Sequence, residues 1–215
     1  TLHKWSVENR NCFWNEVWDF YNVIGHKGEE PYLEPPNKLP GTRFFPNGKL
    51  NYAENMLKKG NSDIAITFWS EDKIKKRLSW SELKNQVAAV ANYFKKKGIE
   101  KGDRVAAYLP NVPETIIFML ASSSIGAIFS SASPDFGVEG VLDRFGQIEP
   151  KVLVTTDGYN FNGKEINITK KVKQVVNSLE SIKNVVLVPL LNSTEVFSSN
   201  KVIFYQDLLN NYKSD

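Results

Sequence analysis

The sequence is poor in the residues from which most catalytic and metal sites are built. It contains one cysteine, Cys12, and two histidines, His3 and His26. A single cysteine rules out an intrachain disulfide, which fits a reducing compartment. Both histidines lie in an aromatic and proline-rich N-terminal stretch, without the spacing of a zinc site and far from any serine nucleophile of a triad. We therefore predict no catalytic residue and no metal ligand in this chain.

The familiar phosphate-binding loops are also missing. No G-x-x-x-x-G-K-[ST] sequence occurs, and no G-x-G-x-x-G sequence follows an expected strand. The serine-rich runs at residues 122–124 and 130–133 lack the glycines that let a backbone close around a phosphate. We interpret both runs as positions where a helix packs closely against a sheet.

Long hydrophobic runs and a strong charge of one sign are absent as well. The longest apolar stretch, residues 115–128, is interrupted by three serines and Gly126, so it is too short and too polar to span a bilayer. The net charge of +3 comes from lysines spread along the chain, which argues against a nucleic-acid partner. The first thirty residues contain no apolar run. We expect no membrane and no nucleic-acid partner, and a cytoplasmic location.

What is present indicates a globular chain with a substantial core, because 41% of the residues are hydrophobic and 24% are charged. Residues 1–60 read as an N-terminal extension. Aromatic and aliphatic residues recur there at helical spacing from Phe13 to Tyr21, and we expect Gly25 to end that helix. Five prolines between Pro31 and Pro46 predict extended or turn conformations, and a short helix is expected at 51–57.

Residues 61–215 alternate between expected strands and helices. We predict strands at 64–69, 73–78, 104–109, 127–131, 152–155, 185–189 and 202–205, and helices at 79–97, 111–125, 138–148, 170–179 and from 206. The first two strands flank Ser70, Glu71 and Asp72, which suggests that they form a hairpin. Ser79 and Glu82 form a capping-box pair, Gly98 supplies a left-handed cap, and Asn111 is the expected cap of the next helix, with Pro113 in its first turn. Most of residues 191–215 look polar and irregular. The pattern predicts an α/β fold whose parallel sheet is flanked by helices on both faces.

One expected loop contains residues suited to binding an anionic ligand. Asn162, Gly163 and Lys164 follow the strand at 152–155, and ligands of open α/β sheets gather beyond the carboxyl ends of strands. Gly163 permits a tight turn, and the ammonium group of Lys164 can face a phosphate. A lysine in a polar loop can equally be only solvated, so this pattern alone leaves both interpretations open.

Long strings of sequence resemble a known family. Residues 42–55 (TRFFPNGKLNYAEN) and 101–111 (KGDRVAAYLPN) resemble acyl-CoA synthetases of the adenylate-forming superfamily. Residues 129–138 (FSSASPDFGV) and 156–164 (TDGYNFNGK) resemble the acetoacetyl-CoA synthetase subgroup, whose S-P-D-F-G segment differs from that of acetyl and propionyl enzymes. The resemblance runs from Trp5 to Asp207 and covers about the first third of such an enzyme. We therefore expect an N-terminal extension (1–60) followed by an incomplete large domain (61–215).

The resemblance implies an ATP-dependent ligase that activates acetoacetate through an acyl-adenylate and transfers it to CoA, with ATP, Mg²⁺ and CoA as cofactors. The segments that hold ATP, adenine and the acyl group lie downstream in the family, so we expect this chain alone to be inactive. In acetyl-CoA synthetases a basic loop touches the phosphates at the nucleotide end of CoA. Gly163 and Lys164 match that loop, whereas Phe161 stands where an arginine is found. Gly163 and Lys164 are therefore the predicted CoA-binding residues.

Other interpretations stay open at this point. The chain could belong to an acetyl- or propionyl-CoA synthetase, or be a free-standing nucleotide-binding, CoA-binding or interaction module. A fragment without activity is the third alternative. The sequence does not indicate an oligomeric state.

Overall fold

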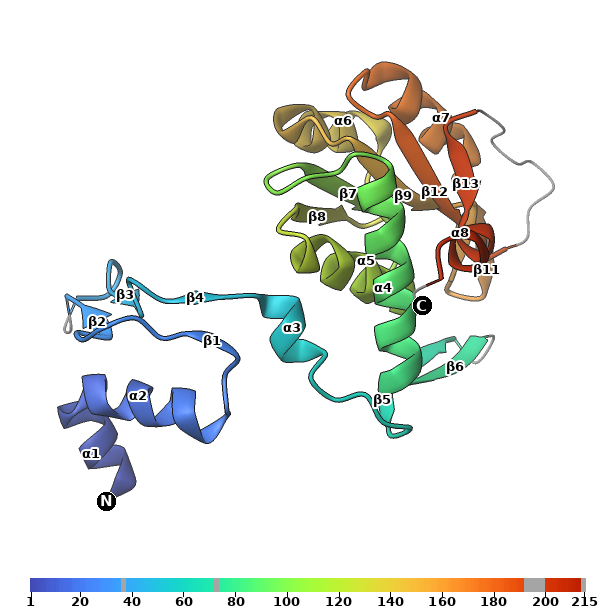
Figure 1. Ribbon diagram of the computed structural model, residues 1–215. Helices are drawn as coiled ribbons and strands as arrows, with labels where there is room; N and C mark the ends of the chain where they lie inside the picture. The colour runs from blue at the N-terminus through green and yellow to red at the C-terminus, as the bar shows by residue number, and fades with distance from the viewer. Residues whose placement is uncertain (36–37, 72–73, 192–199, 214–215) are drawn as a thin grey trace. The chain divides into compact units, whose positions relative to one another are not determined.

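The computed structural model describes residues 1–35, 38–71, 74–191 and 200–213 (Figure 1). The chain divides into two compact units, Thr1–Met56 and Leu57–Asp215. Pro36 of the proline-rich stretch, Asp72 and Lys73 of the first expected hairpin, and residues 192–199 and 214–215 of the irregular stretch lie outside the described residues. No helix in the described ranges combines the length and hydropathy needed to cross a bilayer.

The first unit contains short elements. They are α1 (Leu2–Glu8), α2 (Arg10–Phe20), β1 (Gly25–His26), β2 (Leu33–Glu34), β3 (Arg43–Phe44), β4 (Lys49–Leu50) and α3 (Tyr52–Met56). The strands form two antiparallel pairs, β1 with β4 and β2 with β3. The predicted aromatic helix and the helix at 51–57 are confirmed. The aromatic helix is capped at Tyr21, so the prediction that Gly25 ends it was wrong; Gly25 lies in β1.

Aromatic contacts join α2 to the proline-rich stretch. Trp14 packs edge-on against Phe44 with ring centroids 5.1 Å apart, and Trp18 packs against Phe45 at 4.8 Å. Phe45 also contacts Tyr32 at 5.4 Å. Because short strand pairs are weak on their own, these ring contacts help to hold this unit together.

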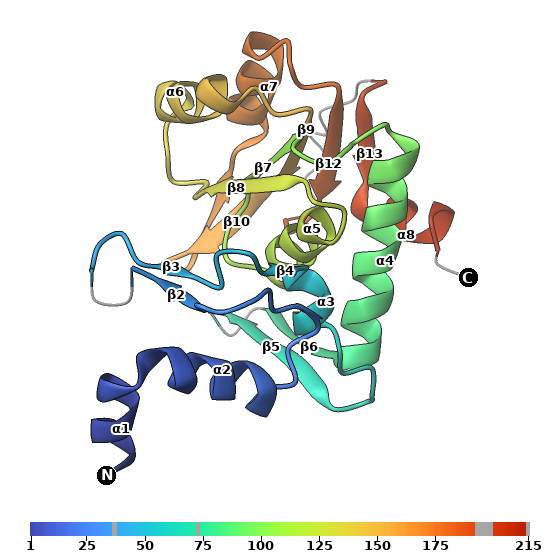
Figure 2. The same cartoon turned by 60° about the vertical axis from the view of Figure 1, so that its left-hand side comes forward.

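The second unit is built on a five-stranded sheet with the order β13-β12-β9-β7-β8, in which all four pairings are parallel. Its strands are β7 (Arg104–Tyr108), β8 (Ile128–Ala132), β9 (Val152–Thr156), β12 (Asn184–Val188) and β13 (Val202–Phe204). Its helices are α4 (Trp80–Lys96), α5 (Pro113–Ser124), α6 (Val138–Ile148), α7 (Thr169–Ser178) and α8 (Tyr205–Asn211). Helices α6 and α7 cover one face, and α4, α5 and α8 cover the other (Figure 2). The predicted α/β fold with a parallel sheet between helices is confirmed.

The local signals in this unit mostly predicted its elements. The capping box of α4 is formed: the Ser79 amide donates to Glu82 Oε2 at 2.8 Å, and the Glu82 amide donates to Ser79 Oγ at 3.2 Å. Such a pair stabilises a helix start by about 1 kcal/mol. Gly98 has the predicted positive φ, 70°. Helix α5, in contrast, is capped by the extended backbone of Val112 without a side-chain bond, so the assignment of Asn111 as its cap was wrong.

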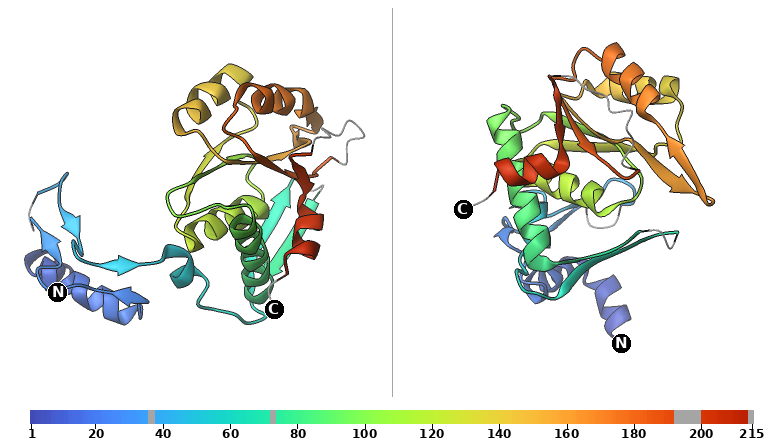
Figure 3. Two further views of the ribbon diagram at one scale, coloured as in Figure 1. Left: turned by 45° about the horizontal axis from the view of Figure 1, so that its top comes forward. Right: turned by 90° about the vertical axis from the view of Figure 1, so that its right-hand side faces the viewer.

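Two antiparallel hairpins accompany the sheet. The predicted hairpin of β5 (Ile64–Ser70) and β6 (Ile74–Ser79) is confirmed. The second hairpin, β10 (Gly158–Phe161) with β11 (Lys164–Asn167), lies where the sequence predicted a loop. It projects beyond the carboxyl end of β9 (Figure 3).

The order of the strands creates a divergence at the middle of the sheet. From β7 the chain crosses through α5 to β8 on one side, and then through α6 to β9 on the other side of β7. The loops that leave the carboxyl ends of β7 and β9 therefore run apart, which is where open α/β sheets bind ligands.

Candidate functional site

The predicted site residues Gly163 and Lys164 lie at the tip of the β10–β11 hairpin. Phe161 pairs with Lys164, which leaves Asn162 and Gly163 as a two-residue turn. Their φ angles, 51° and 73°, are both positive, as a type I′ turn requires. A Cβ on Gly163 would meet no atom within 4 Å, so glycine is favoured there by backbone conformation and not by lack of space.

The two amides of this turn bind a carboxylate. Asn162 N–H donates to Glu71 Oε1 at 2.6 Å, and Gly163 N–H donates to Glu71 Oε2 at 2.9 Å. Glu71 follows β5, at the tip of the other hairpin. Adjacent backbone amides that point at one group form an anion-binding concavity, and here both oxygens of one anion are held. We call Asn162 N–H and Gly163 N–H the amide pair.

Lys164 places a positive charge beside the amide pair. Its side chain is exposed, and none of the salt bridges among the described residues involves it. Phe161 lies directly opposite in the hairpin and is 60% exposed. The structure thus brings the predicted Gly163 and Lys164 together at one exposed turn, with an aromatic ring as their neighbour.

The S-P-D-F-G segment contacts the same hairpin. Tyr159 O–H donates to Asp135 Oδ1, and Ser133 O–H donates to Asp135 Oδ2 at 2.9 Å. These two bonds, with a smaller contribution from Lys171, hold the pKa of Asp135 below its usual value. Burial is the larger cause and the hydrogen bond to Asp135 the smaller one that together raise the pKa of Tyr159 to about 12.

The same segment is fastened to the sheet through Tyr108 of β7. Its buried hydroxyl donates to the carbonyl oxygens of Pro134 at 3.1 Å and Phe136 at 2.6 Å, and burial raises the pKa of Tyr108 to about 12. The Arg144 guanidinium lies 4.3 Å from the centre of the Phe136 ring. The segment that marks the subgroup is therefore held rigidly between β7, α6 and the hairpin.

Asp157 ties the start of the hairpin to the end of β12. Its Oδ1 accepts hydrogen bonds from the amides of Leu190 at 2.8 Å and Leu191 at 3.1 Å. Gly158 follows in a crowded position, where an added Cβ would lie 2.4 Å from Ile166 O and 2.4 Å from Leu191 Cδ1. The hairpin is thus anchored at the carboxyl end of the sheet by the hydrogen bonds to the Asp157 side chain, and Gly158 is packed too closely to accept a side chain.

A cavity of about 290 Å³ opens at this end of the sheet. Asn160 Oδ1 is buried and, among the described residues, has no hydrogen-bond partner. A buried acceptor without a partner costs about 1–3 kcal/mol. Residues from the loop after β7, from β10 and from the β5–β6 hairpin line the cavity, namely Phe68, Trp69, Ser70, Glu71, Ile74, Pro110, Asn111, Val112, Tyr159, Asn160 and Leu190.

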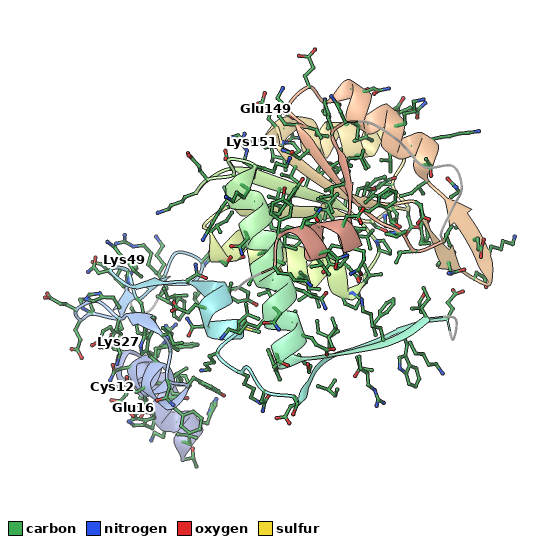
Figure 4. All side chains as sticks on the ribbon, turned by 45° about the vertical axis from the view of Figure 1, so that its right-hand side comes forward. Cys12, Glu16, Lys27, Lys49, Glu149 and Lys151 are labelled. Atoms are coloured by element: carbon green, nitrogen blue, oxygen red, sulfur yellow. The ribbon has the colours of Figure 1, made fainter. Side chains whose placement is uncertain are left out.

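The K-G-D-R-V string lies at the opposite end of the strands, where Figure 4 labels Glu149 and Lys151. Lys151 Nζ donates to Asp103 Oδ2 at 2.7 Å, and Arg104 binds the carbonyl oxygens of Ile148 and Glu149. These contacts join the amino ends of β7 and β9. This string therefore holds the sheet together and does not contribute to the site.

Sequence reasoning found the turn but missed its partners. Glu71 was assigned only to a hairpin connection, and nothing in the sequence indicates that it contacts a turn 91 residues away. The link between Asp135 and Tyr159 was missed because the S-P-D-F-G string was considered only as a subgroup marker. Within the described ranges, no three His, Cys, Asp or Glu side chains lie close enough together to hold a metal ion.

Comparisons with known proteins agree with the fold and the strings. Residues 53–208 match the family model described as AMP-binding enzyme. The chain is 49% identical over 178 residues to acetoacetyl-coenzyme A synthetase of Rhizobium meliloti (83% of this chain, 27% of the relative), and 39% identical over 214 residues to that of Macaca fascicularis (97% and 32%). The solved structure of acetoacetyl-CoA synthetase from Streptomyces lividans superposes with a TM-score of 0.87 at 32% identity, covering all of this chain and 33% of that one.

The chain thus spans about a third of the length of the relatives that it matches. The family model covers most of the chain, and the structural superposition covers all of it. The resemblance predicted from the sequence is confirmed, and this chain belongs to the AMP-binding enzyme family.

Proposed function

We propose that this chain is part of an AMP-forming ligase that makes acetoacetyl-CoA from acetoacetate, ATP and CoA. In the first step, an acetoacetate carboxylate oxygen attacks the α-phosphorus of ATP and expels pyrophosphate. In the second, the CoA thiolate attacks the acyl carbon of the adenylate and expels AMP. The resemblance to acetoacetyl-CoA synthetases along the whole chain, S-P-D-F-G segment included, supports this substrate.

Within that reaction, the hairpin tip contributes to CoA binding. The observation that carries this assignment is the amide pair, which already holds both oxygens of a carboxylate next to the exposed Lys164. A phosphate oxygen accepts from the same donors, and the Lys164 ammonium neutralises part of its charge. Phe161 offers a ring in place of a cation, so phosphate binding here depends on the turn and on Lys164.

The two remaining cofactors, ATP and Mg²⁺, do not match the residues that the structure describes. The described residues offer no set of ligands for the Mg²⁺ that accompanies ATP in this family, and the sequence has no phosphate loop for ATP. We therefore place the ion, the nucleotide and the acyl pocket on segments outside this chain. We place the whole protein in the cytoplasm.

The test of the activity uses the longer protein that contains this chain. Pyrophosphate release is measured with ATP and CoA and with acetoacetate, acetate or propionate as the acid. We expect kcat/KM to be highest with acetoacetate; a much higher value with acetate or propionate would overturn the choice of acid. A second measurement gives the intact mass of the native protein in extract from its source, where an antibody against residues 101–111 identifies it. A mass near 24.4 kDa instead of about three times that value would favour a free-standing CoA-binding module.

A further inference from the structure

The amide pair at the hairpin tip is occupied by a group of the chain itself. Glu71 receives one hydrogen bond on each carboxylate oxygen, at 2.6 Å and 2.9 Å, from two consecutive amides. Two oxygens of a phosphate group, which are separated by a similar distance, would accept the same two bonds. The carboxylate of Glu71 therefore occupies the position that the proposed function assigns to a phosphate.

The contact is built so that it can open. Both tips are exposed, so water can replace the carboxylate at the amides at little cost. Glu71 also has a φ of 45°, in the left-handed region that is unfavourable for residues with a side chain. A contact between two exposed tips, made by a residue with a strained backbone, is readily broken by a ligand that binds the amides more strongly.

We propose that Glu71 is an internal competitor for the phosphate-binding turn and sets its affinity and selectivity. With no ligand present, its carboxylate holds the amide pair and keeps the β5–β6 and β10–β11 hairpins together. A phosphate monoester carries more negative charge than a carboxylate and displaces it, whereas weaker anions do not. This inference rests on the proposed function of the turn, because it identifies the group that a CoA phosphate must displace.

The displaced carboxylate stays nearby, since β5 and β6 tether it, and it repels the bound phosphate. One like charge about 5 Å away in a solvent-exposed site weakens binding by about tenfold. Removing the charge of Glu71 should therefore tighten phosphate binding by about tenfold. A neighbouring carboxylate that does not touch the amide pair should have a much smaller effect.

The experiment is a titration of the ¹⁵N-labelled chain with inorganic phosphate and, separately, with CoA, followed by the amide resonances of Asn162 and Gly163. The variants are Glu71→Gln and, as a matched control, Glu165→Gln. Glu165 is an exposed carboxylate next to Lys164 in β11, so its replacement makes the same change in net charge. Urea unfolding of both variants checks that each is folded.

We expect Glu71→Gln to lower the Kd for phosphate and for CoA by about tenfold and Glu165→Gln by less than about threefold. Without ligand, amide exchange at Asn162 and Gly163 should speed up only in Glu71→Gln. Equal affinities of wild type and Glu71→Gln would overturn the competitor role, while binding of CoA at the two amides would still support the CoA assignment.

The other outcomes separate the two proposals. If phosphate shifts the two amides and binds more tightly to Glu71→Gln but CoA does not bind, the competitor role stands and the CoA assignment falls. If neither ligand shifts the two resonances in any variant, both are overturned.

Discussion

Replacing Gly158 with alanine adds one methyl group at the most crowded glycine of the hairpin. The new Cβ would lie 2.4 Å from Ile166 O and 2.4 Å from Leu191 Cδ1. The leucine side chain can rotate away, but Ile166 O belongs to the backbone of β11, which pairs with β10. To relieve the clash, the first pair of the hairpin must separate.

Overpacking of this kind costs about 1–3 kcal/mol, and the loss of a pairing hydrogen bond adds about 1 kcal/mol. We expect Gly158→Ala to lower the free energy of unfolding by about 3 kcal/mol, measured by urea denaturation followed by circular dichroism. The same substitution at Gly146 serves as the control, because this exposed glycine lies inside α6 and a Cβ there would find its nearest atom, Leu179 Cδ2, at 3.9 Å. Helix propensity predicts a stabilisation of about 0.5–1 kcal/mol for Gly146→Ala. Equal denaturation midpoints of Gly158→Ala and wild type would refute the steric reasoning.

Three further predictions concern single side chains. Lys164→Ala should weaken CoA binding by about fivefold in calorimetry at low salt, and the difference should vanish at about 1 M salt because screening removes it. Tyr159→Phe should lower the free energy of unfolding by about 1 kcal/mol at pH 7. Because the folded-state pKa of Asp135 is depressed, that stabilisation exists above the unfolded pKa of about 4 and is lost as the pH falls through the folded value, so urea denaturation near pH 2 should show a smaller difference. Lys76→Met should cost about 2 kcal/mol in the same assay, since it leaves the buried Glu114 carboxylate without the ammonium that lies 2.7 Å away; an unchanged midpoint would show that this carboxylate needs no cation.

The sequence predicted those elements whose signals are local. The bounds of α6 match the prediction, and α4 has the capping box of Ser79 and Glu82 and the positive φ of Gly98. The parallel character of the sheet also followed from alternating strands and helices. The order of the strands could not be predicted in this way, because it depends on the side of β7 to which each crossover returns.

The hairpin at the site shows why the remainder was missed. Its strands are short, and Tyr159 and Ile166 are the cross-strand pair in which both side chains are largely apolar. The Asn162-Gly163 dipeptide is a strong hairpin signal, but it was interpreted only as a tight turn within a loop. Glu71 could not be found from the sequence, since its contact with the turn depends on how two separate hairpins pack.

The position of β7 in the middle of the sheet also affects how the chain folds. Thr155 of β9 donates its side-chain hydrogen bond to Tyr108 O of β7, across 47 residues of sequence. During synthesis β7 leaves the ribosome well before β9. After α5 and β8 have emerged, β8 can pair with one edge of β7, but the other edge stays unpaired until β9 emerges. Pairing between distant segments is slow, and exposed strand edges invite association between chains. The aggregation risk of this fold should thus be greatest in the interval between the emergence of β8 and that of β9.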